Sequence, residues 1–108
     1  MGKLKLDALK KKELAPGFVA QMIHSDDVTI AFWEINEGSE LPMHSHEHEQ
    51  FSVIQEGEFE FVIEGEKTKA GEGDVIYFAR NQEHGGMALT ACKILDVFAP
   101  ARETYRGA

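Results

Sequence analysis

Hydrophobic and polar residues alternate in short runs along most of this chain. The clearest run is residues 59–63, where Phe59, Phe61 and Ile63 occupy every second position. A period of two is typical of a strand that packs one face on a core. Comparable runs, separated by turn signals such as Glu64-Gly65, predict further strands at residues 18–23, 28–35, 51–55, 67–70, 75–78, 87–89 and 91–98.

The predicted strands outline an all-β, antiparallel fold. About eight short strands with turns every 8–12 residues are typical of a small barrel or sandwich. Both faces of residues 28–35 are largely apolar, so we expect that strand to be covered on both sides. Residues 79–86 are expected to form a loop. Residues 3–14 allow either a short strand or a helical turn, and their pattern leaves both open.

Length and charge restrict the partners. A chain of 108 residues predicts a single domain (1–108), with an N-terminal arm or strand (1–16), a barrel (17–99) and a polar C-terminal tail (100–108). Lys and Arg number 11 and Asp and Glu 19, giving a net charge of −8, which argues against nucleic acid as a partner. The one basic run, Lys10-Lys11-Lys12, is expected to be a solvated face. No secretory signal or membrane span is evident, so we expect a cytoplasmic protein.

Three of the five histidines lie in one short segment between Gly38 and Gly57. His44, His46 and Gln50 are at even positions, so an extended strand would place them on one face. Two imidazoles and an amide oxygen are three potential metal ligands, and the rest of the chain must supply a fourth. A kink near Glu47 would turn His48 outward, which we expect, and His24 is expected to be exposed.

The histidine segment resembles the first cupin motif. The matching residues are Gly38, His44, His46, Gln50 and Gly57, with Gln50 where that motif usually has an acidic residue. Residues 73–88 resemble the second cupin motif. The matching positions are Gly73, Asp74, Ala79, Asn81 and His84. Ala79 and Asn81 stand where Pro and Gly are usual, and Ala88 stands where an Asn often closes the motif. The resemblance implies a small jelly-roll-like cupin barrel.

The resemblance implies that one divalent metal ion (Zn, Ni, Fe or Mn) is bound by His44, His46, Gln50 and His84. Four neutral ligands leave the charge of the metal uncompensated, which favours an anionic ligand and Lewis-acid chemistry. The set also lacks the two histidines and one carboxylate typical of many iron oxygenases. Two alternatives stay open: a metal-dependent oxygenase on the same site, and a non-catalytic cupin that binds a small metabolite.

The C-terminal end, Leu95-Asp96-Val97-Phe98-Ala99-Pro100-Ala101-Arg102-Glu103, resembles the ending of the KdgF subgroup of pectin-degradation cupins. That resemblance implies ring opening of unsaturated monouronates, the sugar acids released by pectate and alginate lyases, into linear keto acids. It implies that Asp96, Phe98 and Arg102 line the substrate site and carry the reaction. It also implies a homodimer.

Each of these residues has a structural alternative. Asp96 lies in an otherwise apolar strand, where it is either paired with Arg80 or Arg102 or acts as a general acid/base. Arg102 is either solvated or binds a carboxylate, and Phe98 is either core or a substrate-facing wall. Cys92 is expected to be a small core residue, and Trp33 and Tyr77 are expected to fill the barrel.

Overall fold

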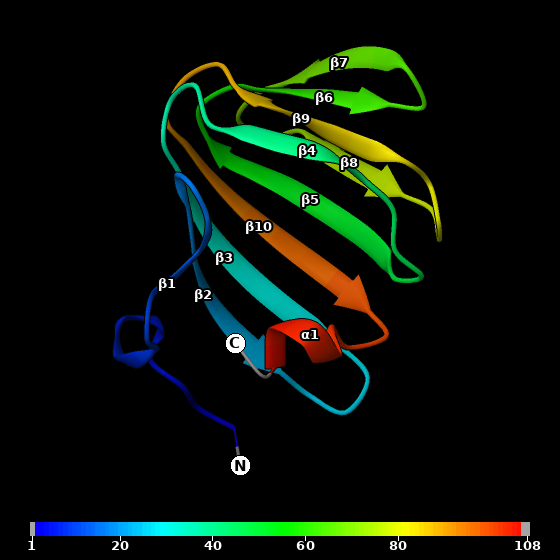
Figure 1. Ribbon diagram of the computed structural model, residues 1–108. Coiled ribbons are helices and arrows are strands. Elements are labelled where there is room, and N and C mark those ends of the chain that lie inside the picture. Colours follow the sequence, from blue (N-terminus) through cyan, green and yellow to red (C-terminus); the bar gives the residue numbers. More distant parts are fainter. Residues whose placement is uncertain (1, 107–108) are drawn as a thin grey trace.

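The alternating runs pair into two antiparallel sheets that face each other (Figure 1). The computed structural model describes residues 2–106. Within them lie a 3-10 turn (Leu6–Ala8), ten strands and a short helix α1 (Glu103–Arg106). The strands are β1 (Lys12–Ala15), β2 (Phe18–His24), β3 (Thr29–Ile35), β4 (Glu40–His44), β5 (Glu49–Glu56), β6 (Phe59–Ile63), β7 (Glu66–Ala70), β8 (Val75–Phe78), β9 (His84–Ala88) and β10 (Cys92–Ala99).

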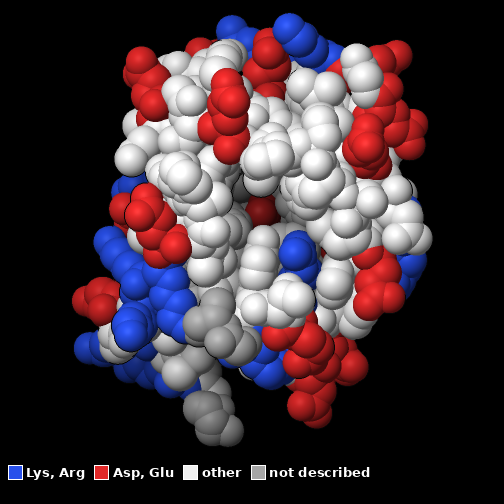
Figure 2. All heavy atoms as spheres, in the orientation of Figure 1, with Lys and Arg blue, Asp and Glu red and all other residues white. Residues whose placement is uncertain are grey.

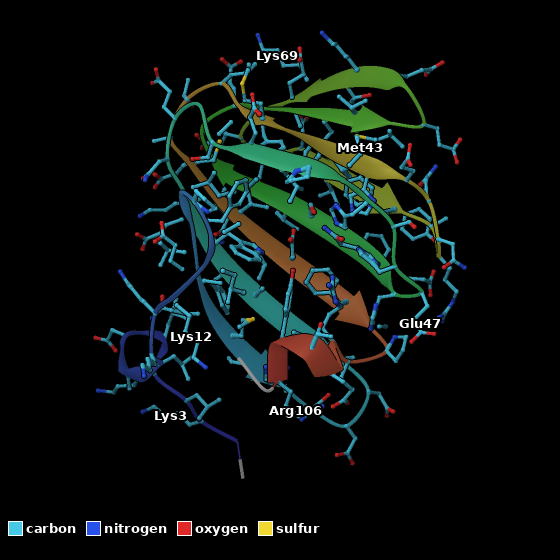
Figure 3. All side chains as sticks on the ribbon, in the orientation of Figure 1. Lys3, Lys12, Met43, Glu47, Lys69 and Arg106 are labelled. Atoms are coloured by element: carbon cyan, nitrogen blue, oxygen red, sulfur yellow. The ribbon has the colours of Figure 1, made fainter. Side chains whose placement is uncertain are left out.

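The six-stranded sheet has the order β1-β2-β3-β10-β5-β8, and the four-stranded sheet has the order β4-β9-β6-β7. Their inner faces meet in a core whose largest buried side chains include Phe59, Phe78 and Phe98. The expected all-β antiparallel architecture is confirmed, although the two sheets remain separate instead of closing into one continuous barrel. The periphery is polar: the labelled side chains of Glu47, Lys69 and Arg106 lie at the outside of the molecule (Figure 3).

The alternation predicted that the histidine segment forms a single strand, and this prediction is wrong. β4 ends at His44, residues 45–48 form a bend, and β5 begins at Glu49. β4 belongs to the small sheet and β5 to the large one, so this segment connects the two sheets. The expected loop at residues 79–86 is also shorter, because β9 already begins at His84. His44 and His84 are therefore direct register partners on neighbouring strands.

Two glycines allow this pairing of β4 with β9. A Cβ at Gly85 would lie 2.7 Å from the carbonyl oxygen of Leu41 on β4. Gly86 has φ +153°, and a Cβ there would lie 2.2 Å from the carbonyl oxygen of Glu60 on β6. Side chains at these positions would push β9 away from its neighbours. The glycines next to His84 thus hold it between β4 and β6.

Residues 100–106 are not the polar tail that the sequence suggested, and residues 107 and 108 of that predicted tail lie outside the described residues. Ala101 is buried, and the ring of Tyr105 in α1 packs edge-on against Trp33 and Phe98. In Figure 1, α1 lies beside the lower ends of β3 and β10. These residues therefore close one side of the space between the sheets.

The outward face of the large sheet is less covered than expected. Ile30 and Phe32 are only partly buried, so β3 packs fully on one face alone. Tyr77 does not fill the interior, because β8 is an edge strand and its ring points outward with 47% exposed. None of the helices in the described residues has the length and apolar character needed to cross a membrane.

Candidate metal centre and cavity

A cavity of about 140 Å³ lies between the two sheets. Figure 2 shows a hollow in the middle of the molecular face, with acidic atoms at its bottom and a basic side chain at its rim. The polar residues lining the cavity come from both sheets and from the C-terminal segment. The lining comprises Leu14, Ala15, Phe18, Trp33, Ile35, Leu41, His44, Gln50, Ser52, Phe59, Phe61, His84, Ile94, Asp96, Phe98, Arg102 and Tyr105.

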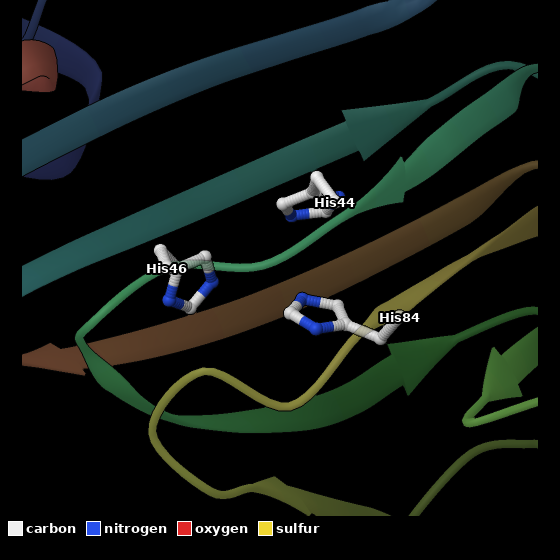
Figure 4. A group of neighbouring side chains, drawn as sticks. All are labelled: His44, His46 and His84. Atoms are coloured by element: carbon white, nitrogen blue, oxygen red, sulfur yellow. The ribbon is translucent and has the colours of Figure 1, made fainter.

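Three imidazoles converge at one end of this cavity (Figure 4). One ring nitrogen each of His44, His46 and His84 lie within 4.8 Å of one another. The ring centroids of His44 and His84 are 4.3 Å apart, and those of His46 and His84 are 5.1 Å apart. His44 comes from the end of β4, His46 from the bend and His84 from the start of β9, so the pairing of β4 with β9 and the bend after β4 bring the three rings together.

Main-chain carbonyls fix the protonation of all three rings. A carbonyl oxygen can only accept a hydrogen bond, so each Nδ1 that contacts one must carry the proton. Each Nε2 is then left with a lone pair, the form in which a neutral imidazole binds a metal. The contacts are His44 Nδ1 to Pro42 O at 2.9 Å, His46 Nδ1 to His48 O at 3.0 Å and His84 Nδ1 to Gln82 O at 2.8 Å.

Gln50 presents a further oxygen to this cluster. Gln50 Nε2 donates to Ser52 Oγ at 2.9 Å, because the Ser52 hydroxyl proton is already donated to Asp96 Oδ1 at 2.5 Å. Gln50 Oε1 therefore faces His46 Nε2, 3.1 Å away. With Nδ1 protonated, both of these atoms are acceptors, and they repel each other unless a cation lies between them.

A second buried acceptor leads to the same conclusion. Among the described residues, no hydrogen-bond donor reaches the buried Nε2 of His84. A buried polar atom without a partner costs free energy, which metal coordination would remove. Burial, followed by the charges of Arg102 and His84, lowers the pKa of His46 to about 4, so its ring is neutral at physiological pH. The donor set therefore fits a divalent metal ion.

Asp96 lies in the same cavity and is 8% exposed. Burial raises the pKa of Asp96 to about 6, against the opposing effect of hydrogen bonding by Ser52 and neighbouring groups. The structural alternative, pairing with an arginine, is not realised: no ion pair within residues 2–106 includes Asp96, and Arg80 pairs with Glu49 at 3.7 Å. A carboxyl group that titrates near neutral pH inside a cavity can both accept and donate a proton.

Arg102 is held at the cavity and is only partly exposed. Its backbone N–H donates to Thr29 Oγ1 at 2.8 Å. Its guanidinium carbon lies 4.2 Å from the ring centroid of Tyr105 and 4.9 Å from that of Phe98. Phe98 is itself 2% exposed, so it is at once a core residue and part of the cavity wall. The two aromatic rings position a cation where it can meet an anionic ligand.

The other sequence expectations have mixed outcomes. Cys92 is buried as expected. His48 is not turned out into solvent: its Nδ1 is buried, and its ring lies 5.4 Å from that of His46. His24 is partly buried, with Nδ1 2.8 Å from Thr29 Oγ1.

Sequence reasoning missed Ser52 and Tyr105. Ser52 could have been found, because it is two residues from Gln50 on β5 and therefore shares its inward face. Tyr105 gave no such signal, because it lies in a segment expected to be a polar tail. Ser52 lies within the first motif but is not one of its matching residues, and Tyr105 shows that part of the cavity depends on a residue outside both motifs.

Comparison with known proteins identifies the family. The family described as "Cupin domain" matches residues 31–98. The pectin degradation protein KdgF of Dickeya dadantii is 33% identical over 97 residues, covering 87% of this chain and 88% of the relative.

Two solved structures share the fold over most of their length. The structure of KdgF from a Halomonas species has a TM-score of 0.86 at 27% identity, over 92% of this chain and 94% of that one. An RmlC-like cupin from Shewanella frigidimarina has a TM-score of 0.87 at 26% identity, over 92% and 90%. The chain belongs to the cupin family and is similar to its KdgF pectin-degradation proteins.

Proposed function

We propose that this protein opens the ring of unsaturated monouronates and releases linear keto acids. The observation that carries the proposal is the buried chain from Gln50 through Ser52 to Asp96, which joins the imidazole cluster to a carboxyl group in one cavity. The likeness to KdgF proteins supports the substrate class, since those relatives are named for pectin degradation. The proposed substrate is a cyclic hemiacetal whose ring oxygen is attached to a C=C bond.

His44, His46, His84 and Gln50 would hold the divalent metal. When bound, the metal would supply a positive charge that attracts the substrate carboxylate and polarises an adjacent oxygen. Imidazole binds a metal in its neutral form and the glutamine amide is uncharged, so the four ligands would leave that positive charge available to an anionic ligand. The Nε2 atoms of the imidazoles and Oε1 of the glutamine are the donor atoms.

Asp96 moves the proton. Its carboxylate takes the proton of the anomeric hydroxyl; the C=O bond forms there, and the bond from that carbon to the ring oxygen breaks. The ring oxygen receives a proton and becomes an enol, which becomes a ketone when a proton moves from that oxygen to carbon. All atoms of the substrate remain in the product. A pKa of about 6 makes both the acceptance and the return of the proton accessible near neutral pH.

Arg102 and Phe98 orient the substrate. The protein carries a net charge of −8, which repels a sugar acid at long range, although salt limits this beyond about 8 Å. A guanidinium at the cavity supplies local attraction and can hold a carboxylate through two hydrogen bonds. Phe98, packed beneath that guanidinium, gives the sugar an apolar wall.

A turnover assay tests the proposal. Metal-loaded protein is mixed with unsaturated galacturonate or mannuronate, and loss of the ultraviolet absorbance of the conjugated double bond is followed. We expect acceleration over buffer, and removal of the metal by a chelator should abolish it. Oxygen uptake with bound iron would instead indicate an oxygenase. Binding of the sugar acid without turnover would indicate a metabolite-binding cupin.

We also propose that the protein is a homodimer through the outward face of the large sheet. Phe51, Val75 and Tyr77 on β5 and β8 are 47%, 56% and 47% exposed, and Phe51 and Tyr77 are register partners. A continuous apolar strip of this kind is typical of an interaction surface. Val75→Lys should convert a dimer to a monomer in size-exclusion chromatography with light scattering, and a monomeric wild type would contradict the proposal.

A further inference from the structure

Trp33 has a feature that its role in the core does not explain. Its side chain is 9% exposed, yet Nε1 makes no hydrogen bond to any of residues 2–106. An indole N–H can only donate, so burying it without an acceptor costs free energy. Most buried polar groups have a partner. The Asp96 carboxyl lies close enough for the Trp33 N–H to lower its pKa, yet no hydrogen bond of good geometry joins the two groups, so the N–H remains available to a ligand.

The ring is fixed on both sides. Phe18 packs edge-on with its centroid 6.1 Å from that of Trp33, and Tyr105 does the same at 6.2 Å. Trp33 lines the cavity on β3, and its register partner on β10 is Ile94. Asp96 lies two residues further along β10, so Trp33 and Asp96 are diagonal neighbours on the inward face. The indole therefore stands beside the carboxyl group.

A second donor in the cavity is also without a partner. The Nε of Arg102 is buried, and no acceptor for it lies within the described part of the chain. Arg102 stacks on Tyr105, which in turn packs against Trp33. The ring of Tyr105 thus contacts both of the side chains whose N–H donor has no partner. These contacts lie on the side of the cavity that carries Asp96.

We infer that the indole N–H of Trp33 is a ligand-binding donor, which donates a hydrogen bond to a hydroxyl or ring oxygen of the sugar acid while Arg102 binds its carboxylate. Only the identity of the ligand rests on the proposed function. A single neutral N–H suits an uncharged oxygen, whereas the guanidinium suits a carboxylate. Trp33 would then determine how the sugar ring is oriented relative to Asp96.

The experiment exploits the fact that the sequence contains one Trp. In the nitrogen–proton spectrum of labelled, zinc-loaded protein, the indole N–H therefore gives one cross-peak. Titration with galacturonate, which lacks the double bond and cannot react, should move that peak downfield and slow its exchange with solvent. Galactose, which has the hydroxyls but no carboxylate, should move it in the same direction at higher concentration.

Two outcomes would overturn the inference. In one, the backbone amides of Asp96 and Arg102 respond to galacturonate while the indole peak does not. In the other, galacturonate does not bind at all. A moving indole peak in a protein that fails to turn over unsaturated galacturonate would support the inference and reject the proposed function, so the two failures are distinguishable.

Substitution supplies a second readout. Replacing Trp33 with 3-benzothienylalanine keeps the shape of the ring but removes the N–H, and should raise KM roughly tenfold with a smaller change in kcat. Trp33→Phe should act in the same direction. Phe32→Leu is the matched control, because Phe32 precedes Trp33 in the chain but lies on the outward face of β3, away from the cavity, and this variant should leave KM unchanged. An unchanged KM in the benzothienylalanine variant would overturn the inference.

Discussion

The two ends of the cavity are built differently. At the imidazole end, each ring is fixed by a main-chain carbonyl two residues away in the sequence. At the carboxyl end, the fixing contacts join distant residues: Ser52 to Asp96, 44 positions apart, and Thr29 to Arg102, 73 apart. The orientation of each ring at the imidazole end therefore depends on local chain geometry, whereas the side chains at the carboxyl end are oriented by the packing of the whole fold. This difference separates metal binding from proton transfer and substrate orientation, and substitutions should separate them too.

The largest effect should follow from removing an imidazole. His46→Ala deletes a neutral ligand and leaves Gln50 Oε1 without its neighbour, so metal affinity should fall by roughly 100-fold or more and turnover should be lost. Metal content after dialysis against a chelator measures this. His48→Ala is the matched control, since the hydrogen bond from His46 goes to the backbone carbonyl of His48, which alanine keeps, and this variant should retain metal. Full metal retention in the His46 variant would contradict the ligand assignment.

A substitution at the carboxyl end should reduce turnover without affecting metal binding. Asp96→Asn keeps the shape of the side chain but removes the proton-transferring group, so kcat should fall by about 10²–10⁴-fold while metal content is unchanged. Asp74→Asn is a matched control, because Asp74 is an exposed turn residue that accepts a hydrogen bond from Gly71 N–H. If Asp96→Asn lost the metal and activity together, the two ends would not be separable.

In metal-free protein, the pH dependence of stability should reveal the burial of the carboxyl group of Asp96. The folded pKa of Asp96, about 6, lies above its ordinary value of 3.8, because burial disfavours the charged form. The native state therefore binds more protons than the unfolded state in this window, and the contribution of Asp96 to stability falls as pH rises from about 4 to 6. Because asparagine does not titrate, the Asp96→Asn variant should not lose stability in this pH range for this reason.

Relative to wild type, the Asp96→Asn variant should therefore gain on the order of 3 kcal/mol in free energy of unfolding between pH 4 and 7. Urea unfolding in the presence of a chelator measures this. The same comparison for Asp74→Asn should show little change with pH. A stability difference between Asp96→Asn and wild type that is independent of pH would show that the Asp96 carboxyl is not desolvated.

The same difference explains how far the sequence could be read. A period-two pattern located β6 at its observed bounds, and a short apolar run after a turn signal located β8, because both signals reflect local backbone geometry. The convergence of His44 with His84 was expected from the resemblance to the cupin motifs, and a kink near Glu47 was expected, but the division of β4 and β5 between two sheets was not. Ser52 and Tyr105 contribute through contacts between distant segments, which no local pattern encodes. The imidazole end was therefore largely predictable, and the supporting contacts of the carboxyl end were not.

The smallest effect should come from Arg102→Lys. Lysine keeps the positive charge but loses the planar group that stacks on Phe98 and Tyr105 and that binds a carboxylate through two hydrogen bonds. KM for an unsaturated monouronate should rise about tenfold, with a smaller change in kcat and none in metal content. Arg80→Lys, on the exposed rim, is the matched control. Because charge alone survives in the lysine variant, an unchanged KM would mean that Arg102 attracts the substrate without orienting it, and orientation at the carboxyl end would then depend on Asp96 and Trp33.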